Sequence, residues 1–462
     1  MTIRDECGVI GVHGEEAARA AILGLHALQH RGQESAGVAT FDGIPHLHKG
    51  MGLVEHVFAP LPDLPGEWAI GHNRYSTSGT SVAASAGPFL VETDLGPLAL
   101  AHNGNIVNAG AIRQRLADDH GLTPVSDSDS ELLALLLAVA PGESWPVRIR
   151  WMAERALGAY ALVLLTESGL FGVRDPMGIR PLALGRTAGG WVLASESCAF
   201  AVLGGRHVRE LEPGEILSLT PNGPAPAGQL PAMPRAFCAF ESIYLSRPDT
   251  VYGGRTVHAT RRAMGEQLAL EYPVEADLVV GVPDSGTSAA LGYAAQSGIP
   301  FGEGLIKNRY IARTFIQPDQ TERERLIRMK FAPLPLRGKR VVLVDDSVVR
   351  GNTLGPIVAL LRGAEAREVH VRVACPPLTH PCYLGVDMAS PGEFIANRVP
   401  PEAMAAYVGA DSLGYLSVSG LLRAVHGSTD DHCLACFTGR YPIPLLDSAV
   451  GTPEPALQEL AP

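Results

Sequence analysis

The sequence predicts two domains, an α+β domain followed by an α/β domain. In the first half, short apolar runs are broken repeatedly by glycine, a pattern typical of a β-rich domain. In the second half, short apolar strands alternate with helical patterns, which indicates βαβ units and a mostly parallel sheet covered by helices. Between the halves, Thr220–Pro234 has five prolines and no charged residue, so we interpret it as an extended connector.

The expected elements follow in chain order. Strands of the first domain are expected at Gly8–His13, Leu98–His102, Tyr160–Thr166, Leu170–Arg174 and Trp191–Ser195, and its helices at Ala17–His30 and Glu131–Ala140. Strands of the second domain are expected at Leu278–Val282, Val341–Val344 and Glu368–Ala374, and its helices at Arg261–Glu271, Ser288–Gln296 and Thr353–Leu361. We place the first domain at residues 7–235 and the second at 236–446, with six residues before them and a loose tail at 447–462.

The composition excludes several classes of protein. A net charge of −11 argues against wholesale electrostatic binding to nucleic acid. The longest strongly apolar stretch, Leu132–Ala140, is far shorter than the roughly 18 residues of a membrane span, and Met1–Glu6 lacks the apolar region of a secretory signal. Seven scattered cysteines do not suggest a disulfide framework. We therefore expect a cytoplasmic protein without membrane or nucleic-acid partners.

The most informative segment of the second domain is Val341–Thr353. Four apolar residues form a buried strand that ends in two carboxylates, Asp345 and Asp346, and a turn of small and hydroxyl residues leads into a helix. Ligands bind at the carboxyl ends of strands in such sheets, and backbone N–H groups at a helix N-terminus hold phosphate. The two carboxylates suit a ribose diol or Mg²⁺. A Walker-B strand is the alternative, but the Gly-x-x-x-x-Gly-Lys-Ser/Thr loop that it requires is absent from the sequence.

Two further segments of the second domain point to the same kind of ligand. The loop Val282–Thr287 follows another short apolar strand and would face the same crevice. The stretch Lys307–Lys330 carries seven basic residues against three acidic ones. We interpret this stretch as a basic lid over a polyphosphate ligand, with a solvated surface helix as the alternative.

The first domain carries the parts of a thiol-dependent amidase. Removal of residues 1–6 would make Cys7 the N-terminal residue, with an α-amine of pKa about 7.7–8.0 as a general base for its own thiol. The guanidinium of Arg74 suits an α-carboxylate, and Asp129 offers a counter-charge for an α-ammonium group. Asn103 and Gly104 supply an amide side chain and a glycine N–H, which suit an oxyanion hole. For Cys7 taken alone, a buried structural cysteine is the alternative.

The remaining cysteines include a C-x-x-C pair, Cys433 and Cys436. Two-residue spacing lets both thiolates reach one metal site. A redox dithiol is one alternative, although no βαβ pattern follows the pair closely. Zinc is another, because His380 and His432 lie nearby in the sequence. Two other cysteines, at positions 198 and 375, are interpreted as small buried hydrophobes.

These motifs resemble two known families. The acidic strand end and its turn resemble the 5-phosphoribosyl-1-diphosphate (PRPP) motif of type I phosphoribosyltransferases, and Tyr310–Pro318 is similar to the flexible loop of their glutamine-dependent members. The ordered motifs of the first half, together with His30–Gly37, resemble class II glutamine amidotransferases. That resemblance implies an αββα fold of the N-terminal-nucleophile type. From about Cys7 to Pro444, the chain resembles the amidophosphoribosyltransferase family.

The resemblance implies a reaction and a set of site residues. Cys7 would release ammonia from glutamine, and the ammonia would attack PRPP to give 5-phosphoribosylamine and diphosphate, the committing step of de novo purine synthesis. PRPP binding is assigned to Lys307, Asp345, Asp346, Ser347, Arg350, Gly351, Asn352 and Thr353, and Mg²⁺ contacts to Ser285, Asp345 and Asp346. Asn352 stands where the related enzymes commonly have threonine, which puts one phosphate contact in doubt.

The resemblance extends to a cofactor and to partners. In the branch of the family with an N-terminal propeptide, which here would be residues 1–6, four cysteines hold a [4Fe-4S] cluster. The matching residues are Cys238, Cys382, Cys433 and Cys436. The family also implies feedback inhibition by purine nucleotides and a homotetramer or homodimer.

Two functions of other classes remain as alternatives. A PRPP-sensing regulator would need a DNA-binding module, and the acidic sequence shows none. Other class II amidotransferases, such as hexosamine-phosphate or asparagine synthetases, lack the acidic phosphate turn at Asp345 and Asp346, so that motif distinguishes them.

Overall fold

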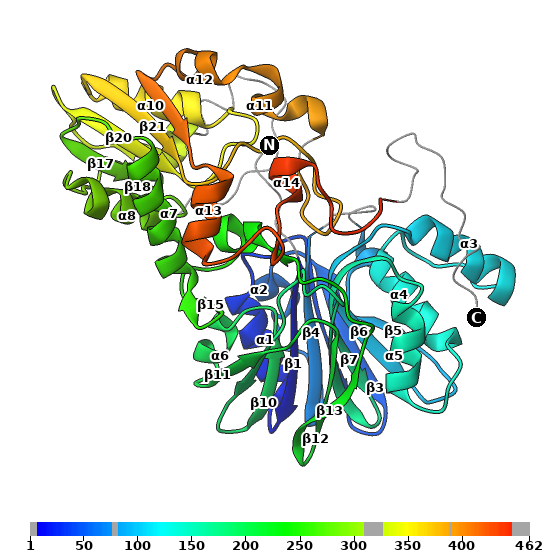
Figure 1. Ribbon diagram of the computed structural model, residues 1–462. Coiled ribbons are helices and arrows are strands. Elements are labelled where there is room, and N and C mark those ends of the chain that lie inside the picture. Colours follow the sequence, from blue (N-terminus) through cyan, green and yellow to red (C-terminus); the bar gives the residue numbers. More distant parts are fainter. Residues whose placement is uncertain (1–6, 76–81, 309–326, 389, 446–462) are drawn as a thin grey trace.

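The computed structural model describes residues 7–75, 82–308, 327–388 and 390–445, and its two halves have different architectures (Figure 1). The expected propeptide, most of the basic stretch Lys307–Lys330 and the expected tail lie outside the described residues. In the ranges that are described, no helix has the length and apolar character needed to cross a membrane.

Two antiparallel sheets form the first half. One sheet has the strand order β11 (Arg206–Glu210), β9 (Ala183–Arg186), β10 (Gly190–Ala194), β1 (Gly8–Gly14), β4 (Trp68–Arg74), β2 (Ser35–Phe41) and β3 (Pro45–Met51). The other has the order β13 (Gly223–Gln229), β12 (Glu215–Thr220), β8 (Gly169–Arg174), β7 (Gly158–Thr166), β6 (Leu98–Ile106) and β5 (Phe89–Val91). The short apolar runs of the sequence are thus strands, as predicted.

Helices cover the outer face of each sheet. The first sheet is covered by α1 (Ala17–Ala27), α2 (Val54–Val57) and α6 (Cys198–Val202), and the second by α3 (Ala109–His120), α4 (Asp129–Val139) and α5 (Trp145–Ala153). A third apolar cluster, which includes Val9, Ile70 and Val163, fills the space between the two sheets. Strand β7 is buried along nearly its whole length because it lies between the other sheet and the helices. The layers are therefore αββα, as expected.

The interpretation of Thr220–Pro234 as a connector is wrong for half of this segment. Gly223–Gln229 is strand β13, which pairs antiparallel with β12 at the edge of the second sheet. Proline lacks an N–H group but is tolerated on an edge strand, where half of the backbone groups face away from the sheet. Pro224 and Pro226 make a strand unexpected from the sequence, but they do not prevent its pairing with β12.

A parallel sheet forms the centre of the second half. Its strand order is β17 (Leu278–Gly281), β20 (Arg340–Asp345), β21 (Glu368–Val373) and β22 (Ser412–Tyr415). The larger helices are α7 (Val257–Glu271), α8 (Thr287–Ser297), α10 (Leu354–Gly363), α12 (Pro401–Val408) and α13 (Val418–Val425). Smaller elements are β14 (Phe237–Cys238), η2 (Glu241–Leu245), β15 (Val251–Tyr252), β16 (Arg255–Thr256), β18 (Leu305–Lys307), β19 (Phe331–Pro333), η3 (Pro391–Glu393), α11 (Ile395–Arg398), β23 (His432–Cys433) and α14 (Ala435–Thr438). The α/β prediction for this half is confirmed.

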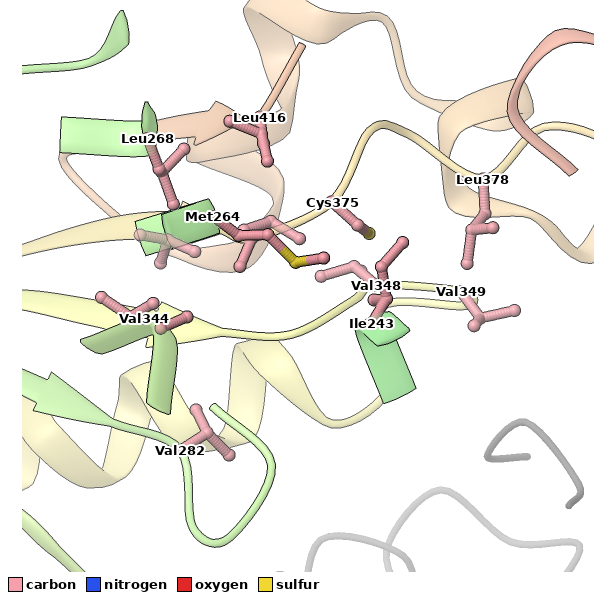
Figure 2. Packing of buried hydrophobic residues seen from close by; sticks show 14 of the residues in the cluster. Ile243, Met264, Leu268, Val282, Val344, Val348, Val349, Cys375, Leu378 and Leu416 are labelled. Carbon is pink, nitrogen blue, oxygen red and sulfur yellow. The ribbon is translucent and has the colours of Figure 1, made fainter. Parts of the chain in front are cut away.

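One apolar cluster joins the sheet of the second half to the loops at its carboxyl edge. Val344 of β20 belongs to it, and so do Val348 and Val349 of the following turn (Figure 2). Ile243 of η2 packs into the same cluster, so the turn after β20 rests on the segment that begins the second domain. Helix α7 starts four residues earlier than predicted because the side chain of Thr256 caps it by accepting a hydrogen bond from the backbone of Ala259 at 3.2 Å.

Candidate active sites

Cys7 lies directly before β1 and is buried, with 8% of its surface exposed. Its Sγ donates to the carbonyl oxygen of Tyr75 at 3.8 Å. Burial raises the pKa of the Cys7 thiol to about 11, against the opposing effects of the Tyr75 backbone and the Arg74 charge. The thiol is therefore protonated at neutral pH in this environment, and a nucleophilic role requires a base.

The two charged residues predicted to bind an amino acid lie close to Cys7. Gly8 of β1 pairs with Asn73 of β4, which places Arg74 next to Cys7 across the sheet. Asp129 begins α4, and its Oδ2 accepts a hydrogen bond from the backbone of Ile106 at 3.1 Å. The pKa of Cys7 responds to the charges of both Arg74 and Asp129. Three residues that are far apart in the sequence therefore meet at one place.

The predicted oxyanion hole lies on β6, which extends beyond the expected Leu98–His102 to Ile106. Asn103 is completely buried, and neither its Nδ2 nor its Oδ1 has a partner among the described residues. A buried amide in this state costs about 1–3 kcal/mol, which a ligand would recover by hydrogen bonding. Gly104 has φ +147°, and a Cβ there would stand 1.9 Å from the carbonyl oxygen of Ala159, so only glycine fits.

At the carboxyl edge of the parallel sheet, two loops meet beside the predicted acidic pair. The backbone of Val282 donates to the carbonyl of Val344 at 2.9 Å, which places the loop after β17 against the end of β20. Burial and the neighbouring Asp346 raise the pKa of Asp345. Burial also raises the pKa of Asp346, although hydrogen bonds from Ser285 and Ser347 oppose the shift. Ser285 and the two carboxylates therefore lie together, as the sequence predicts.

The turn after Asp346 leads into α10, as a phosphate-binding turn does. Its backbone is fixed by Gly351, where φ is +74° and a Cβ would stand 2.3 Å from Cδ1 of Ile395. Arg350 donates through Nε to Oε1 of Glu393 at 2.9 Å, so its guanidinium is already oriented by a carboxylate. Lys307, at the end of β18, forms an ion pair with Asp284 of the other loop. Asn352 and Thr353 lie at the start of α10 in the same turn.

The four cysteines assigned to a cluster line one pocket between three segments of the second half. The pairing of β14 with β23 sets Cys238 beside Cys433, and the other two thiols come from Cys382 and Cys436. The pocket has a cavity volume of about 20 Å³, and Arg180 of the first half also lines it. Within the described ranges, no three His, Cys, Asp or Glu side chains converge closely enough to hold a single metal ion.

The cysteines left outside this set and the two histidines do not line this pocket. Cys198 and Cys375 are buried, which confirms the prediction for both. His380 and His432 do not line the pocket, and His380 hydrogen-bonds to the hydroxyl of Thr379 at 2.8 Å.

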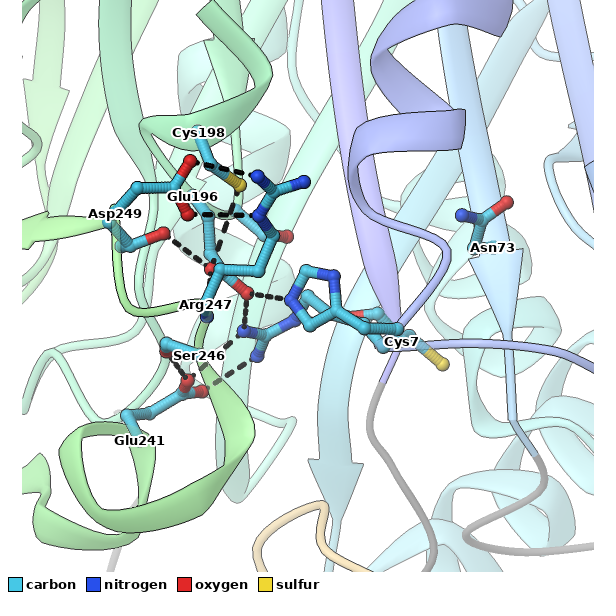
Figure 3. A network of polar contacts seen from close by, with 12 residues as sticks. Cys7, Asn73, Glu196, Cys198, Glu241, Ser246, Arg247 and Asp249 are labelled. Atoms are coloured by element: carbon cyan, nitrogen blue, oxygen red, sulfur yellow. Dashed lines mark hydrogen bonds and ion pairs between the residues drawn. The ribbon is translucent and has the colours of Figure 1, made fainter. Parts of the chain in front are cut away.

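Sequence reasoning missed a group of buried charged residues between the two halves. Arg31 and Glu196 belong to the first half, and Glu241 and Arg261 to the second. Arg31 has ion pairs with both carboxylates, at 2.6 Å to Glu196 and 2.7 Å to Glu241 (Figure 3). The motif His30–Gly37 contains Arg31, but no local pattern in the sequence identifies its partners.

Comparison with known proteins finds one family model in each half of the chain. Residues 72–202 match the family model of a glutamine amidotransferase domain, and residues 250–391 match that of a phosphoribosyl transferase domain. The amidophosphoribosyltransferase of Synechococcus elongatus is 48% identical over 451 residues, covering 95% of this chain and 92% of the relative. That of Methanothermobacter thermautotrophicus is 45% identical over 454 residues, covering 96% of each chain.

A solved structure shares the whole architecture. The glutamine PRPP amidotransferase from B. subtilis, complexed with ADP and GMP, superposes with a TM-score of 0.89 at 44% identity, covering 96% of this chain and 98% of that one. A thiol site and a phosphate site, joined in this order and matched along nearly the full length, identify the reaction as glutamine-dependent amination of PRPP in purine biosynthesis. The chain belongs to the amidophosphoribosyltransferase family.

Proposed function

We propose that Cys7 is the nucleophile of glutamine hydrolysis and that Asn103 and Gly104 stabilise the oxyanion. The Cys7 thiol gives up its proton to a base, and the thiolate attacks the side-chain amide carbon of glutamine. The C–N bond then breaks as the leaving nitrogen takes up that proton and departs as ammonia. Water then cleaves the γ-glutamyl thioester, which yields glutamate and restores the thiol. Arg74 binds the α-carboxylate and Asp129 the α-ammonium group. The observation that carries this assignment is the buried amide of Asn103, which has no partner among the described residues and lies on β6, a strand of the sheet that packs against β1.

We assign the role of general base to the α-amine of Cys7, exposed by removal of residues 1–6. The thiol needs a base because its pKa is about 11 where it is buried. An α-amine has a pKa of about 7.7–8.0, so it can accept the proton of its own side chain at neutral pH. Residues 1–6 lie outside the described residues, and the intact mass of the active enzyme tests their removal.

The experiment that tests the nucleophile separates the two half-reactions. Cys7→Ala should abolish glutamine-dependent diphosphate release, while an ammonium salt at high pH still supports it, because the PRPP site needs only ammonia. Glutamine-dependent release at the wild-type rate would exclude Cys7 as the nucleophile. Full activity in protein that retains Met1–Glu6 would exclude the α-amine as its base.

PRPP is proposed to bind at the carboxyl edge of the parallel sheet. Backbone N–H groups from Ser347 to Thr353 bind the phosphate, and Lys307 and Arg350 provide positive charge. Asp345, Asp346 and Ser285 fit Mg²⁺, because they are oxygen ligands and a divalent cation would stabilise two buried carboxylates. Burial raises the pKa values of both, and the neighbouring Asp346 raises that of Asp345 further. Mg²⁺, when bound, neutralises the departing diphosphate. The residues that bind PRPP also orient its anomeric carbon towards the incoming ammonia.

A [4Fe-4S] cluster is proposed for Cys238, Cys382, Cys433 and Cys436. Each of these cysteines would bind a different iron atom, so the ligands of such a cluster surround a volume instead of converging on one point. The shared pocket and its cavity support this donor set. The lack of a convergent three-residue group in the described ranges argues against a single zinc ion. Together with the expected removal of residues 1–6, the cluster would assign the enzyme to the propeptide and iron–sulfur branch of its family, which we propose.

Regulation and assembly are proposed from the family. Purine nucleotides are proposed as feedback inhibitors, since the solved B. subtilis relative is complexed with ADP and GMP. A homotetramer or homodimer is proposed for assembly. The domain boundary is placed at 235/236, between the end of β13 and the start of β14. All seven cysteines are free thiols, as in proteins of a reducing compartment, so we assign the enzyme to the cytoplasm.

A further inference from the structure

The carboxylate of Glu241, in the second half of the chain, contacts Arg31 of the first half. Glu241 begins η2 and is completely buried. Its Oε1 accepts a hydrogen bond from Nη2 of Arg31 at 2.7 Å, and its Oε2 accepts one from Nη1 at 3.0 Å. This two-bond pairing of a planar guanidinium with a carboxylate fixes both position and orientation. Figure 3 shows Glu241 on the opposite side of this network from Cys7.

The same guanidinium holds the backbone of the nucleophile. Nε of Arg31 donates to the carbonyl oxygen of Cys7 at 3.1 Å, and Nη1 also donates to Glu196 at 2.6 Å. Arg31 is 1% exposed, so water does not compete for these bonds. Glu196 is shared with His30, the backbone of Arg247 and the hydroxyl of Thr250. Glu196 accepts one hydrogen bond from Arg31, whereas Glu241 accepts two. The orientation of Arg31 therefore depends strongly on Glu241.

Glu241 is itself anchored in the second half. Ser246 donates to its Oε2 at 2.7 Å, and Arg180 approaches its Oε1 at 3.4 Å. Arg261 donates to the carbonyl oxygens of Ser242 and Ser246, at 2.9 and 2.8 Å, and so fixes the whole of η2. The guanidinium of Arg261 lies near Asp346, whose charge acts on it. The turn that carries Glu241 thus lies close to the proposed PRPP site.

We propose that Glu241 is a positioning residue for glutamine hydrolysis: from the phosphoribosyltransferase domain it holds Arg31, and through Arg31 the backbone of Cys7. This inference rests on the proposed role of Cys7 as the nucleophile. The Glu241 carboxylate is completely buried and bound by protein side chains, so it acts through Arg31 on the chemical step and not on glutamine binding. The glutaminase centre is therefore completed by the other domain.

The test uses the full-length enzyme and three variants. Glu241→Gln removes the charge, Glu241→Asp keeps the charge but shortens the reach, and Glu271→Gln is the matched control. Glu271 is a partly buried carboxylate of the same domain that binds Ser417 and Arg423 and has no contact with Arg31. Each variant is assayed for glutamine hydrolysis, for diphosphate release with ammonium salt, and for the rate at which iodoacetamide alkylates Cys7.

For Glu241→Gln we expect the kcat of glutamine hydrolysis to fall on the order of 10²-fold with an unchanged KM, because a displacement of about 1 Å has this effect on a reacting group. The alkylation rate of Cys7 should change, while ammonium-dependent release and both activities of Glu271→Gln should not. A wild-type kcat in Glu241→Gln, or an equal loss of both routes, would overturn the proposal.

If Glu241→Gln does not fold, Glu241→Asp provides the test of the proposal, since it keeps the negative charge that balances the buried guanidinium of Arg31. It should lower kcat with glutamine in the same selective way, and a wild-type value would again overturn the proposal. Failure of both variants to fold would assign Glu241 a purely structural role and overturn it as well. Cys7→Ala distinguishes failure of the proposed function from failure of this inference. If that variant still uses glutamine, the assignment of Cys7 as the nucleophile fails, and not only the role of Glu241.

Discussion

Gly104→Ala is expected to disable glutamine hydrolysis while leaving the PRPP site intact. Gly104 lies on β6 opposite Tyr160 of β7, and its φ of +147° is a conformation that alanine strongly disfavours. A Cβ at this position would stand 1.9 Å from the carbonyl oxygen of Ala159 and 2.9 Å from Nε2 of His102. The first contact involves backbone, so the strand itself has to move.

The size of the effect follows from that contact. To reach even 3.0 Å, the backbone has to shift by about 1 Å. Such a shift misplaces the N–H of residue 104 and the amide of Asn103 together, and losing one oxyanion donor costs about 10²–10³ in kcat, or about 2.7–4 kcal/mol. The backbone conformation itself costs on the order of 1–3 kcal/mol of folding stability. We expect a 10²–10³-fold lower kcat and a measurably lower melting temperature.

The assay measures glutamate formation and diphosphate release, with either glutamine or an ammonium salt as nitrogen source. Gly110→Ala is the matched control, because Gly110 lies in α3 and a Cβ there meets nothing within 4 Å. This control should keep both activities. The reasoning is refuted if folded Gly104→Ala retains the wild-type kcat with glutamine, or if it loses the ammonium-dependent route to the same extent.

Three further predictions concern the other charged and thiol groups. Asp346→Asn should lower both the glutamine- and the ammonium-dependent rates, because both use PRPP; loss of the glutamine route alone would contradict this assignment. Protein purified without oxygen should contain about four iron and four sulfide per chain, and Cys436→Ser should remove them and lower stability; stoichiometric zinc without sulfide would contradict the cluster. Glu196→Gln should cost about 3–5 kcal/mol at pH 7 because it breaks a buried ion pair. Burial favours a higher pKa for Glu196, but His30 and Arg31 hold it well below its ordinary value, so its contribution is present above about pH 4.3 and is lost on further acidification. The difference between variant and wild type in urea unfolding should therefore shrink below about pH 4.3, and a constant difference would disprove the linkage.

The local sequence was sufficient to predict the strands and helices, and those candidate site residues that are adjacent in the chain. Strand and helix periodicity depend on neighbouring residues, so β20, its acidic end and the turn into α10 could be predicted together. Asn103 and Gly104 were found in the same way, as a short motif. Errors arose where tertiary pairing overrides local composition, as at Gly223–Gln229, which becomes an edge strand despite its prolines because β12 offers unpaired backbone groups.

The sequence by itself determined the two fold classes, the order of the two domains and the candidate residues of each site. Only the tertiary structure decided how these sites are connected. Arg31 and Glu241 are 210 positions apart, and nothing in the local pattern of either indicates the other. The four-thiol pocket likewise needs three separate segments to meet. The physical reason is that a buried charge or thiol site is defined by what surrounds it after folding, whereas periodicity and short motifs report only on neighbours along the chain.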